Sequence, residues 1–555
     1  MKRIPILRQA LLIILVGLML VPFAAAQFIP VSEEAASCTS IMVGRKVTTD
    51  GSVITCHSCD GRYRTWVNIV PHRKFDPGAT RKIEWGLLHN EFATDRRNVI
   101  IKGEIPEAAE TYSYLNVAYP ALNEKQLAMG ETTFGGKEAL FNDDGLFQIE
   151  ELQAIALERC SSAREAIRLM GGLATQYGYG DYGECLTVAD KKEVWHFEIM
   201  GAGIEQVGAV WAAVRIPDDH VGISANICRI STLDLDKPDY YMASENVFSL
   251  AEQLGFWKKE SGKPFRFWEA YGGRKPFSTR EFYVLSTLAP DLQLNSEMEE
   301  LPFSVKPDKK LDVRDVMAFY RSTYEGTDLD ATKNLLVPKR TSFRRQPENP
   351  PANPEKVKSS WASPFISGDL RQLLNELKPG VIENQRTIAI SACSYSTVIQ
   401  CRDWLPDAIG GVAWFSFDNP ACSPRVPIYA GTLSLPESFA ICGQHRYRED
   451  AAIWHFRRVN RLAELKWERT RSMVNDATRE FEDKAFIELP LMDKIATDIY
   501  KTDQGKEPEK DERGNLKPLK YQEFITNYTN TFARATMTRW DELYEQLWTL
   551  YARGF

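Results

Sequence analysis

Cys38 is the first residue of the chain whose type and position suggest chemistry. It follows a short segment of polar and small residues, QFIPVSEEAAS (27–37), which itself follows an N-terminal apolar run. If the bond between Ser37 and Cys38 were cut, Cys38 would carry both a thiol and an α-amine. Their ordinary pKa values are about 8.5 and about 7.7–8.0, so the amine can accept the thiol proton near neutral pH. The pattern predicts a nucleophile that carries its own base.

Two other interpretations of Cys38 stay open on the residues alone. The tetrapeptide Ala35-Ala36-Ser37-Cys38 has some likeness to a lipidation box, in which the cysteine would carry a membrane anchor. The apolar segment ends well before it, however, and the box lacks its usual leucine. Alternatively, Cys38 is a buried strand residue, which is a common place for cysteine.

Cys56 and Cys59 form a C-x-x-C pattern, which is typical of a redox centre or of half a zinc site. A structural zinc site would need two more ligands, and the sequence has no second C-x-x-C and no H-x₃₋₅-H pattern. A redox pair normally opens a helix, whereas this pair follows a predicted strand. We therefore expect neither role. A disulfide among the ten cysteines stays open.

The N-terminus has the pattern of a secretory signal peptide. Lys2, Arg3 and Arg8 precede an apolar run over residues 10–23, and three alanines follow at 24–26. We expect cleavage after Ala26, which makes residues 1–26 a signal peptide and 27–37 a connector. The alternative, an uncleaved anchor, fits less well because the run is short for a span of about 20 residues. The sequence thus predicts an exported protein, periplasmic or extracellular, without stable membrane insertion after cleavage.

Composition narrows the class of protein. The chain of 555 residues is 44% hydrophobic and 26% charged, as in ordinary globular proteins. Its formal net charge is −7, without a basic block, which argues against nucleic-acid binding.

Hydrophobic periodicity predicts short strands flanked by helices. A helix is predicted over 149–170, ended by Gly171-Gly172, and further helices over 445–484 and 521–551. A Pro-rich connection lies at 344–356 and a polar loop at 503–517. The predicted strands cover residues 38–43, 52–56, 66–70, 185–189, 193–200, 209–216, 221–225, 386–394 and 411–417.

Several segments, in order, resemble one family. They are CTSIMVGRKVTTDGSVITCHSCDGRYRTW (38–66), YPALNEKQLAMGETTFGG (119–136), GDYGECLTVADKKEVWHFEIMG (180–201), WAAVRIPDDHVGISANICRIS (211–231) and WLPDAIGGVAWFSFDNPACSPRVPIYAG (404–431). The run resembles the dipeptidase family of N-terminal-nucleophile cysteine hydrolases (peptidase family C69), relatives of penicillin acylases and bile-salt hydrolases. The resemblance continues more weakly to the end of the chain.

This resemblance implies an α+β fold, the four-layer αββα sandwich with two antiparallel sheets. It implies a catalytic domain over 38–440, with the Pro-rich stretch as an insertion, and a mainly helical extension over 441–555. By the same resemblance Cys38 matches the nucleophile and Asp60 an aspartate that orients the α-amine. Asn226 matches an asparagine whose amide helps to bind the oxyanion.

Three further positions bear on substrate binding. Where many relatives outside the dipeptidase branch carry arginine, this chain has His57, so the local charge differs. Thr133 stands near a second asparagine of bile-salt hydrolases, and Glu131 is a candidate partner for a substrate ammonium group. These differences argue against bile-salt hydrolysis.

The implied activity is hydrolysis of small peptides through an acyl-enzyme on Cys38, with no cofactor and no metal. The expected partner is a small peptide substrate, and a homo-oligomer is possible. Two alternatives remain: an acylase or amidase acting on another small amide, and a non-enzymatic exported binding protein or lipoprotein.

Overall fold

The computed structural model describes residues 37–273, 277–339, 354–504 and 517–554. The predicted signal peptide, all of the connector except Ser37, residues 344–353 of the Pro-rich stretch and residues 505–516 of the polar loop lie outside the described residues. Residues from Ser37 to Phe555 belong to one compact unit. The predicted domain boundary at residue 440 stays a prediction.

The first of two large sheets has seven antiparallel strands in the order β16-β14-β1-β2-β19-β20-β21. Its strands are β16 (Ser304–Val305), β14 (Val221–Ser224), β1 (Ser40–Val43), β2 (Val53–Asp60), β19 (Cys393–Cys401), β20 (Val412–Phe417) and β21 (Val426–Tyr429). Its central strands are buried along their whole length. Such burial requires cover on both faces of the sheet.

The second sheet has eight antiparallel strands in the order β15-β13-β12-β11-β10-β9-β8-β3. They are β15 (Tyr241–Ala243), β13 (Ala209–Arg215), β12 (Val194–Gly201), β11 (Gly183–Ala189), β10 (Ala128–Gly135), β9 (Leu122–Asn123), β8 (Tyr114–Asn116) and β3 (Asn68–Val70). Three two-stranded sheets pair β4 (Arg73–Lys74) with β7 (Glu110–Thr111), β5 (Thr80–Trp85) with β6 (Ile100–Pro106), and β17 (Leu336–Pro338) with β18 (Lys356–Lys358).

The two large sheets pack against each other through β1 and β2 of the first and β10, β11 and β12 of the second. Hydroxyl pairs cross between them: Thr55 with Thr187 and Thr132 with Ser224, each at 2.6 Å between the oxygens. The approach is closest at Gly130, where a Cβ atom would lie 2.3 Å from the carbonyl oxygen of Cys56. Glycine is therefore required at this contact.

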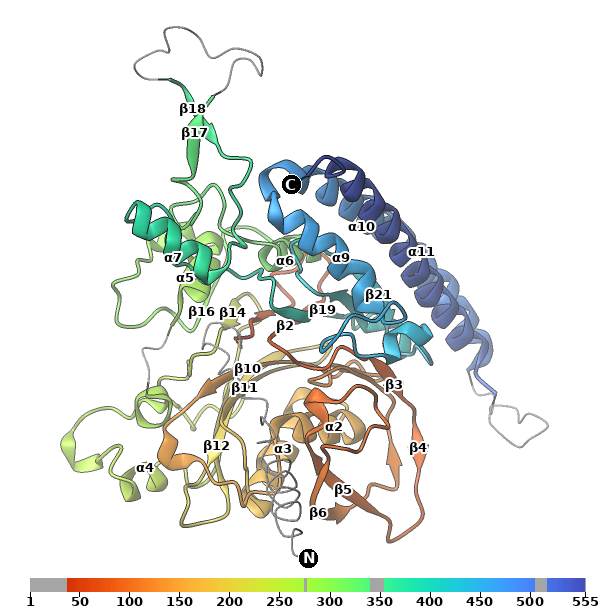
Figure 1. Ribbon diagram of the computed structural model, residues 1–555. Coiled ribbons are helices and arrows are strands. Elements are labelled where there is room, and N and C mark those ends of the chain that lie inside the picture. Colours follow the sequence, from red (N-terminus) through yellow and green to blue (C-terminus); the bar gives the residue numbers. More distant parts are fainter. Residues whose placement is uncertain (1–36, 274–276, 340–353, 505–516, 555) are drawn as a thin grey trace, which may run out of the picture. The chain divides into compact units, whose positions relative to one another are not determined.

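Helices cover the outer face of each sheet (Figure 1). On the eight-stranded sheet α2 (Ile149–Arg159) lies near β7, β8 and β9, and α3 (Ala163–Tyr177) near β11, β12 and β13. On the seven-stranded sheet α5 (Thr279–Leu288) contacts β14 and β16, and α6 (Val313–Tyr320) contacts β19. Near its other edge, α9 (Ala452–Leu465) contacts β20 and α11 (Lys520–Leu550) contacts β21, while α10 (Trp467–Asp503) packs on both helices. The fold is thus mixed helix and antiparallel sheet, as expected.

The remaining helices are short, apart from α7 (Gly368–Leu377). They are α4 (Ser249–Gln253), α8 (Asp407–Gly410), the 3-10 turns η1 (Leu87–His89), η2 (Glu138–Leu140), η3 (Lys259–Ser261), η5 (Pro290–Leu292) and η6 (Glu437–Ala440), and the π-helical turn η4 (Trp268–Gly272). In the described part of the chain, the helices are too short or too polar to cross a bilayer.

The single helix predicted over 149–170 is wrong in two respects. The chain leaves the helix at Cys160 and re-enters one after Ser162, whose side chain accepts a hydrogen bond from the backbone N–H of Glu165. Gly171 and Gly172 do not end this second helix. A Cβ atom at Gly171 would lie 2.3 Å from the Trp211 ring, so the glycine lets α3 pack closely on β13.

The strand predicted over 386–394 is also wrong, because β19 begins only at Cys393. Residues before it form a loop in which Ile388 and Ala389 are buried. A short apolar run does not distinguish a buried loop from a strand. The helical pattern over 445–484 begins only with α9 at Ala452 and continues in α10 to Asp503, and the closing helix is confirmed as α11.

Candidate active site

The register of the first sheet brings Asn226 next to Cys38. Ser40 of β1 pairs with Ser224 of β14 in an antiparallel ladder. Continued for two residues beyond the strand ends, this register would set Cys38 opposite Asn226, and Arg280 donates to both residues. Asn226 has a φ of 62°, in the left-handed region that asparagine tolerates better than most residues. The chain turns there, directly after the strand ends.

The same strand β1 positions Asp60 through its other neighbour, β2. A bridge pairs Thr39 with Ser58, so Asp60 lies opposite Ser37. The backbone N–H of Thr39 donates to Ser58 Oγ at 3.1 Å, and Ser58 Oγ donates to Asp60 Oδ2 at 3.1 Å. Asp60 is fully buried and is thereby connected to the backbone beside Cys38.

Two arginines that sequence reasoning missed hold the backbone around Cys38. Arg280, at the start of α5, donates to the Cys38 carbonyl oxygen and, at 2.9 Å, to Asn226 Oδ1. Arg386, in the loop before β19, donates to the Ser37 carbonyl oxygen and, at 2.6 Å, to Asp60 Oδ2. The Ser278…Glu281 capping box could have indicated the start of α5, but no pattern indicates where Arg386 lies.

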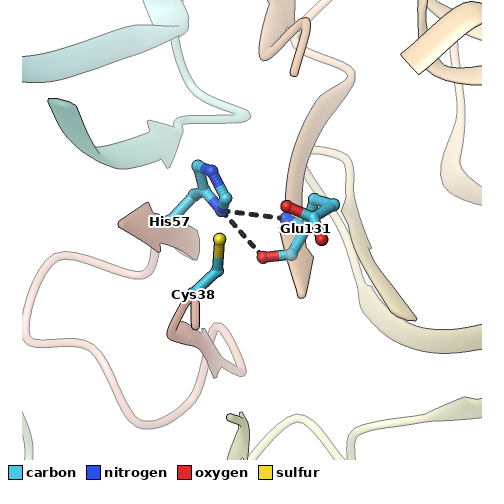
Figure 2. A group of neighbouring side chains, drawn as sticks. All are labelled: Cys38, His57 and Glu131. Atoms are coloured by element: carbon cyan, nitrogen blue, oxygen red, sulfur yellow. Dashed lines mark hydrogen bonds between the residues drawn. The ribbon is translucent and has the colours of Figure 1, made fainter. Parts of the chain in front are cut away.

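Cys38 also lies beside His57 and Glu131, one ligand-type atom of each residue being within 4.8 Å of the others. Figure 2 shows the thiol at the end of its strand, pointing toward the other two side chains. His57 Nδ1 lies 2.8 Å from the carbonyl oxygen and 3.1 Å from the backbone nitrogen of Glu131. Burial lowers the pKa of His57 to about 4, so the ring is neutral at physiological pH. In this position His57 links β2 to β10.

The Cys38 thiol is protonated while Ser37 is attached. A hydrogen bond with Cys59, then burial and the nearby Glu131 carboxylate, raise its pKa well above the ordinary value. His57 is a poor base for it, because burial lowers the pKa of its ring to about 4. A free α-amine on Cys38 would bring a base directly to the thiol.

A thiol, an imidazole and a carboxylate are also ligands for a soft divalent ion. Here such an ion would have to compete with the Glu131 backbone for His57 Nδ1. Of the C-x-x-C pair, Cys59 hydrogen-bonds to Cys38 but is not part of this close group of ligand atoms, and Cys56 lies elsewhere. Cys56 and Cys59 are three residues apart in β2, so they point to opposite faces of the sheet. All ten cysteines are free thiols.

Glu131, Thr133 and Glu184 share one face of the second sheet. Thr133 of β10 pairs with Glu184 of β11, and Glu131 lies two residues along β10. The Thr133 hydroxyl donates to Glu131 Oε1 at 3.2 Å, and the Thr133 carbonyl oxygen accepts from Asn226 Nδ2 at 2.7 Å. Burial raises the pKa of Glu131 to about 7, and burial together with the charge of Glu131 raises that of Glu184 well above its ordinary range.

All six residues singled out from the sequence therefore lie in one connected region, together with the unpredicted Arg280, Arg386 and Glu184. The six are Cys38, His57, Asp60, Glu131, Thr133 and Asn226.

Comparison with known proteins gives a consistent result. The chain is 26% identical over 429 residues to a protein named "Probable dipeptidase" from Latilactobacillus sakei, covering 73% of this chain and 76% of that one. It is 26% identical over 415 residues to a "Probable dipeptidase" from Salmonella dublin, covering 71% and 81%. It is 22% identical over 498 residues to "Probable dipeptidase B" from Streptococcus pyogenes serotype M1, covering 86% and 89%.

The family model described as peptidase family C69 matches residues 37–480, most of the chain. The match begins one residue before the thiol around which the site is built. The chain therefore belongs to peptidase family C69.

Proposed function

We propose that this protein is an exported cysteine dipeptidase that uses Cys38 as its N-terminal nucleophile. The observation that carries the proposal is the convergence of Asp60, Asn226 and Glu131 on Cys38, the second residue of the family match. The names of the relatives support a dipeptide as substrate. Two packed antiparallel sheets with helices outside fit the sandwich of N-terminal-nucleophile hydrolases.

The active form requires removal of residues 1–37. The signal peptide would direct export, and a cut between Ser37 and Cys38 would then free the α-amine. Asp60 lies opposite Ser37 in the strand register, where the new amine would form, and its carboxylate is suited to orient an ammonium group. Arg386, which pairs with Asp60, would lose its hydrogen bonds to the Ser37 hydroxyl and carbonyl oxygens in this change.

The first chemical step forms the acyl-enzyme. The Cys38 amine takes the thiol proton, and Sγ attacks the carbonyl carbon of the substrate peptide bond. Negative charge then develops on the carbonyl oxygen. One hydrogen of Asn226 Nδ2 is bound to the Thr133 carbonyl oxygen, and the second is available to this oxyanion. Arg280 fixes the amide orientation by donating to Oδ1.

Collapse of this intermediate breaks the C–N bond of the substrate. The protonated Cys38 amine gives its proton to the leaving nitrogen, which departs as the free amine of the second amino acid. Water then attacks the thioester, the amine accepting its proton, and releases the first amino acid and the Cys38 thiol. Each step uses groups of the chain and water.

Replacement of Cys38 by alanine tests the proposal. We expect Cys38→Ala to abolish hydrolysis of a mixed panel of dipeptides while the thermal melt stays close to that of the wild type, because no other group can form the acyl-enzyme. Cys160→Ala is the matched control, a buried thiol outside the site that should leave activity unchanged. Near-wild-type hydrolysis by Cys38→Ala would refute the proposal.

Treatment with chelator and alkylating agent separates this chemistry from metal-dependent hydrolysis. Dialysis against EDTA should leave dipeptide hydrolysis intact, whereas iodoacetamide should remove it by alkylating Cys38. Activity that is lost in EDTA and restored by zinc would contradict the thiol mechanism.

A further inference from the structure

Glu131 and Glu184 are buried carboxylates for which the protein provides no counter-charge. Glu131 is 0% exposed to solvent and Glu184 is 2% exposed. Throughout the described ranges, no lysine, arginine or histidine forms an ion pair with either carboxylate. The Oε2 atom of each carboxylate has no hydrogen-bond partner, whereas Glu131 Oε1 accepts from the neutral Thr133 hydroxyl at 3.2 Å. Burial of an unpaired charge costs free energy. Such carboxylates therefore either stay protonated or bind a cation from outside the chain.

The two groups act as one acidic pair. They lie on the same face of neighbouring strands, at a diagonal position in the β10–β11 ladder. Each carboxylate raises the proton affinity of the other, because two negative charges this close cannot both form easily in a buried site. Near neutral pH the pair therefore holds a proton that a positively charged ligand can replace.

The pair also lies at a fixed distance from the nucleophile. A ligand-type oxygen of Glu131 is within 4.8 Å of Cys38 Sγ. In a peptide, the α-nitrogen and the carbonyl carbon of one residue are joined through Cα and are about 2.5 Å apart. A carbonyl carbon poised for attack lies about 3–3.5 Å from the nucleophile. A substrate whose first carbonyl faces Sγ can thus bring its α-nitrogen within hydrogen-bond reach of Glu131.

We infer that Glu131 and Glu184 together bind the α-ammonium group of the substrate, and so restrict this site to peptides with a free amino terminus. The inference rests on the proposed function and deepens it by defining the substrate class. The specific role of Glu184 is to provide the second carboxylate that faces the substrate ammonium group. On binding, the substrate keeps its ammonium protons, and the proton shared by the carboxylates passes to solvent.

An N-acylated peptide should be rejected at this pair for two physical reasons. Its neutral amide brings no positive charge, so the carboxylates stay protonated or unpaired. Its acyl group would also have to occupy the space beside Glu131. The buried carboxylate would then have an apolar neighbour in place of an ammonium group. A binding site for a long acyl chain would instead present apolar side chains at this point.

The test compares free and N-acetylated forms of alanyl-alanine and leucyl-glycine with the processed enzyme. We expect kcat/KM to be at least about 100-fold higher for the free forms, because an ammonium–carboxylate contact typically changes affinity about 10- to 100-fold and two carboxylates share it. In Glu184→Gln and Glu131→Gln this preference should fall about tenfold or more, mainly through KM for the free peptides. Glu151→Gln is the control, a buried glutamate on α2 that is paired with Arg81 and should keep the wild-type preference.

The outcomes separate this inference from the proposed function. Equal hydrolysis of free and N-acetylated peptides by the wild type would overturn the inference while leaving the dipeptidase proposal intact. An unchanged preference in both glutamine variants would overturn the role of the acidic pair. Absence of hydrolysis of every dipeptide would instead contradict the proposed function. Because the comparison of substrates needs only the wild type, a variant that fails to fold does not decide the result.

Discussion

Among the regions of this chain that bury carboxylates, two differ clearly in whether the protein provides the counter-charge. At the contact between α10 and the first sheet, Asp493 binds Arg402 through both oxygens, at 2.5 and 3.3 Å, and accepts from the Tyr429 hydroxyl at 2.9 Å. Beside Cys38, Glu131 and Glu184 have no such cation among the described residues.

The difference indicates what each carboxylate is for. Arg402 also donates to the carbonyl oxygens of Ile409 and Gly410 in α8. Its ion pair with Asp493 therefore joins α10 to the backbone of α8. In this ion pair each charge is neutralised by a group of the protein, and the contact stabilises the folded state. The pair beside the nucleophile leaves its charge unsatisfied, and this is the arrangement expected of a group that binds a ligand or takes part in chemistry.

The largest expected effect is on stability, at the compensated region. Asp493→Ala leaves the Arg402 guanidinium buried without its partner, and we expect the free energy of unfolding to fall by about 3–5 kcal/mol. Denaturant unfolding measures this loss. The kcat and KM of the remaining folded enzyme should not change. If Asp493→Ala changed KM and left the free energy of unfolding unchanged, Asp493 would have a functional role. The contrast with the carboxylates beside Cys38 would then be wrong.

The next effect is on turnover, at the site itself. Asn226→Ala removes a donor that meets full negative charge only in the transition state, so kcat should fall about 100- to 1,000-fold with little change in KM. Steady-state kinetics on a dipeptide, with a thermal melt as the control for folding, measure the effect. Unfolding of the variant would favour a structural role for Asn226 at its left-handed turn.

The smallest effect is a dependence of substrate binding on pH. The pKa of Glu131 is raised to about 7 by burial, so the acidic pair gains negative charge as the pH rises through this value. An ammonium group binds the charged form, and KM for free dipeptides should therefore fall about five- to tenfold between pH 6 and 7.5. Glu131→Gln should flatten this profile. A KM that rises over the same range would contradict the assignment.

The sequence was most informative where chemistry or periodicity is local. Cys38 could be singled out because a thiol next to a potential amine is reactive by its own pKa values. The strand at residues 412–417 and the closing helix α11 follow from hydrophobic pattern alone. The resemblance to peptidase family C69 added Asp60 and Asn226, which no local pattern distinguishes from turn residues.

The remaining parts depend on contacts between distant segments. Glu184 reads as an ordinary strand residue until the β10–β11 register sets it opposite Thr133. Arg386 lies in a loop whose apolar residues predict a strand, and only the folded chain brings it to Asp60. The break at Cys160 is likewise invisible in the helical pattern, because residues on both sides have the same period.

The state of Cys38 in the active protein decides most directly whether this residue is the N-terminal nucleophile. Intact mass and N-terminal sequence of the purified active enzyme measure it, with activity recorded on the same sample. We expect a chain that begins at Cys38 with an unmodified α-amine. A fully active chain that begins at Gln27, or one that carries diacylglycerol on Cys38, would contradict this expectation.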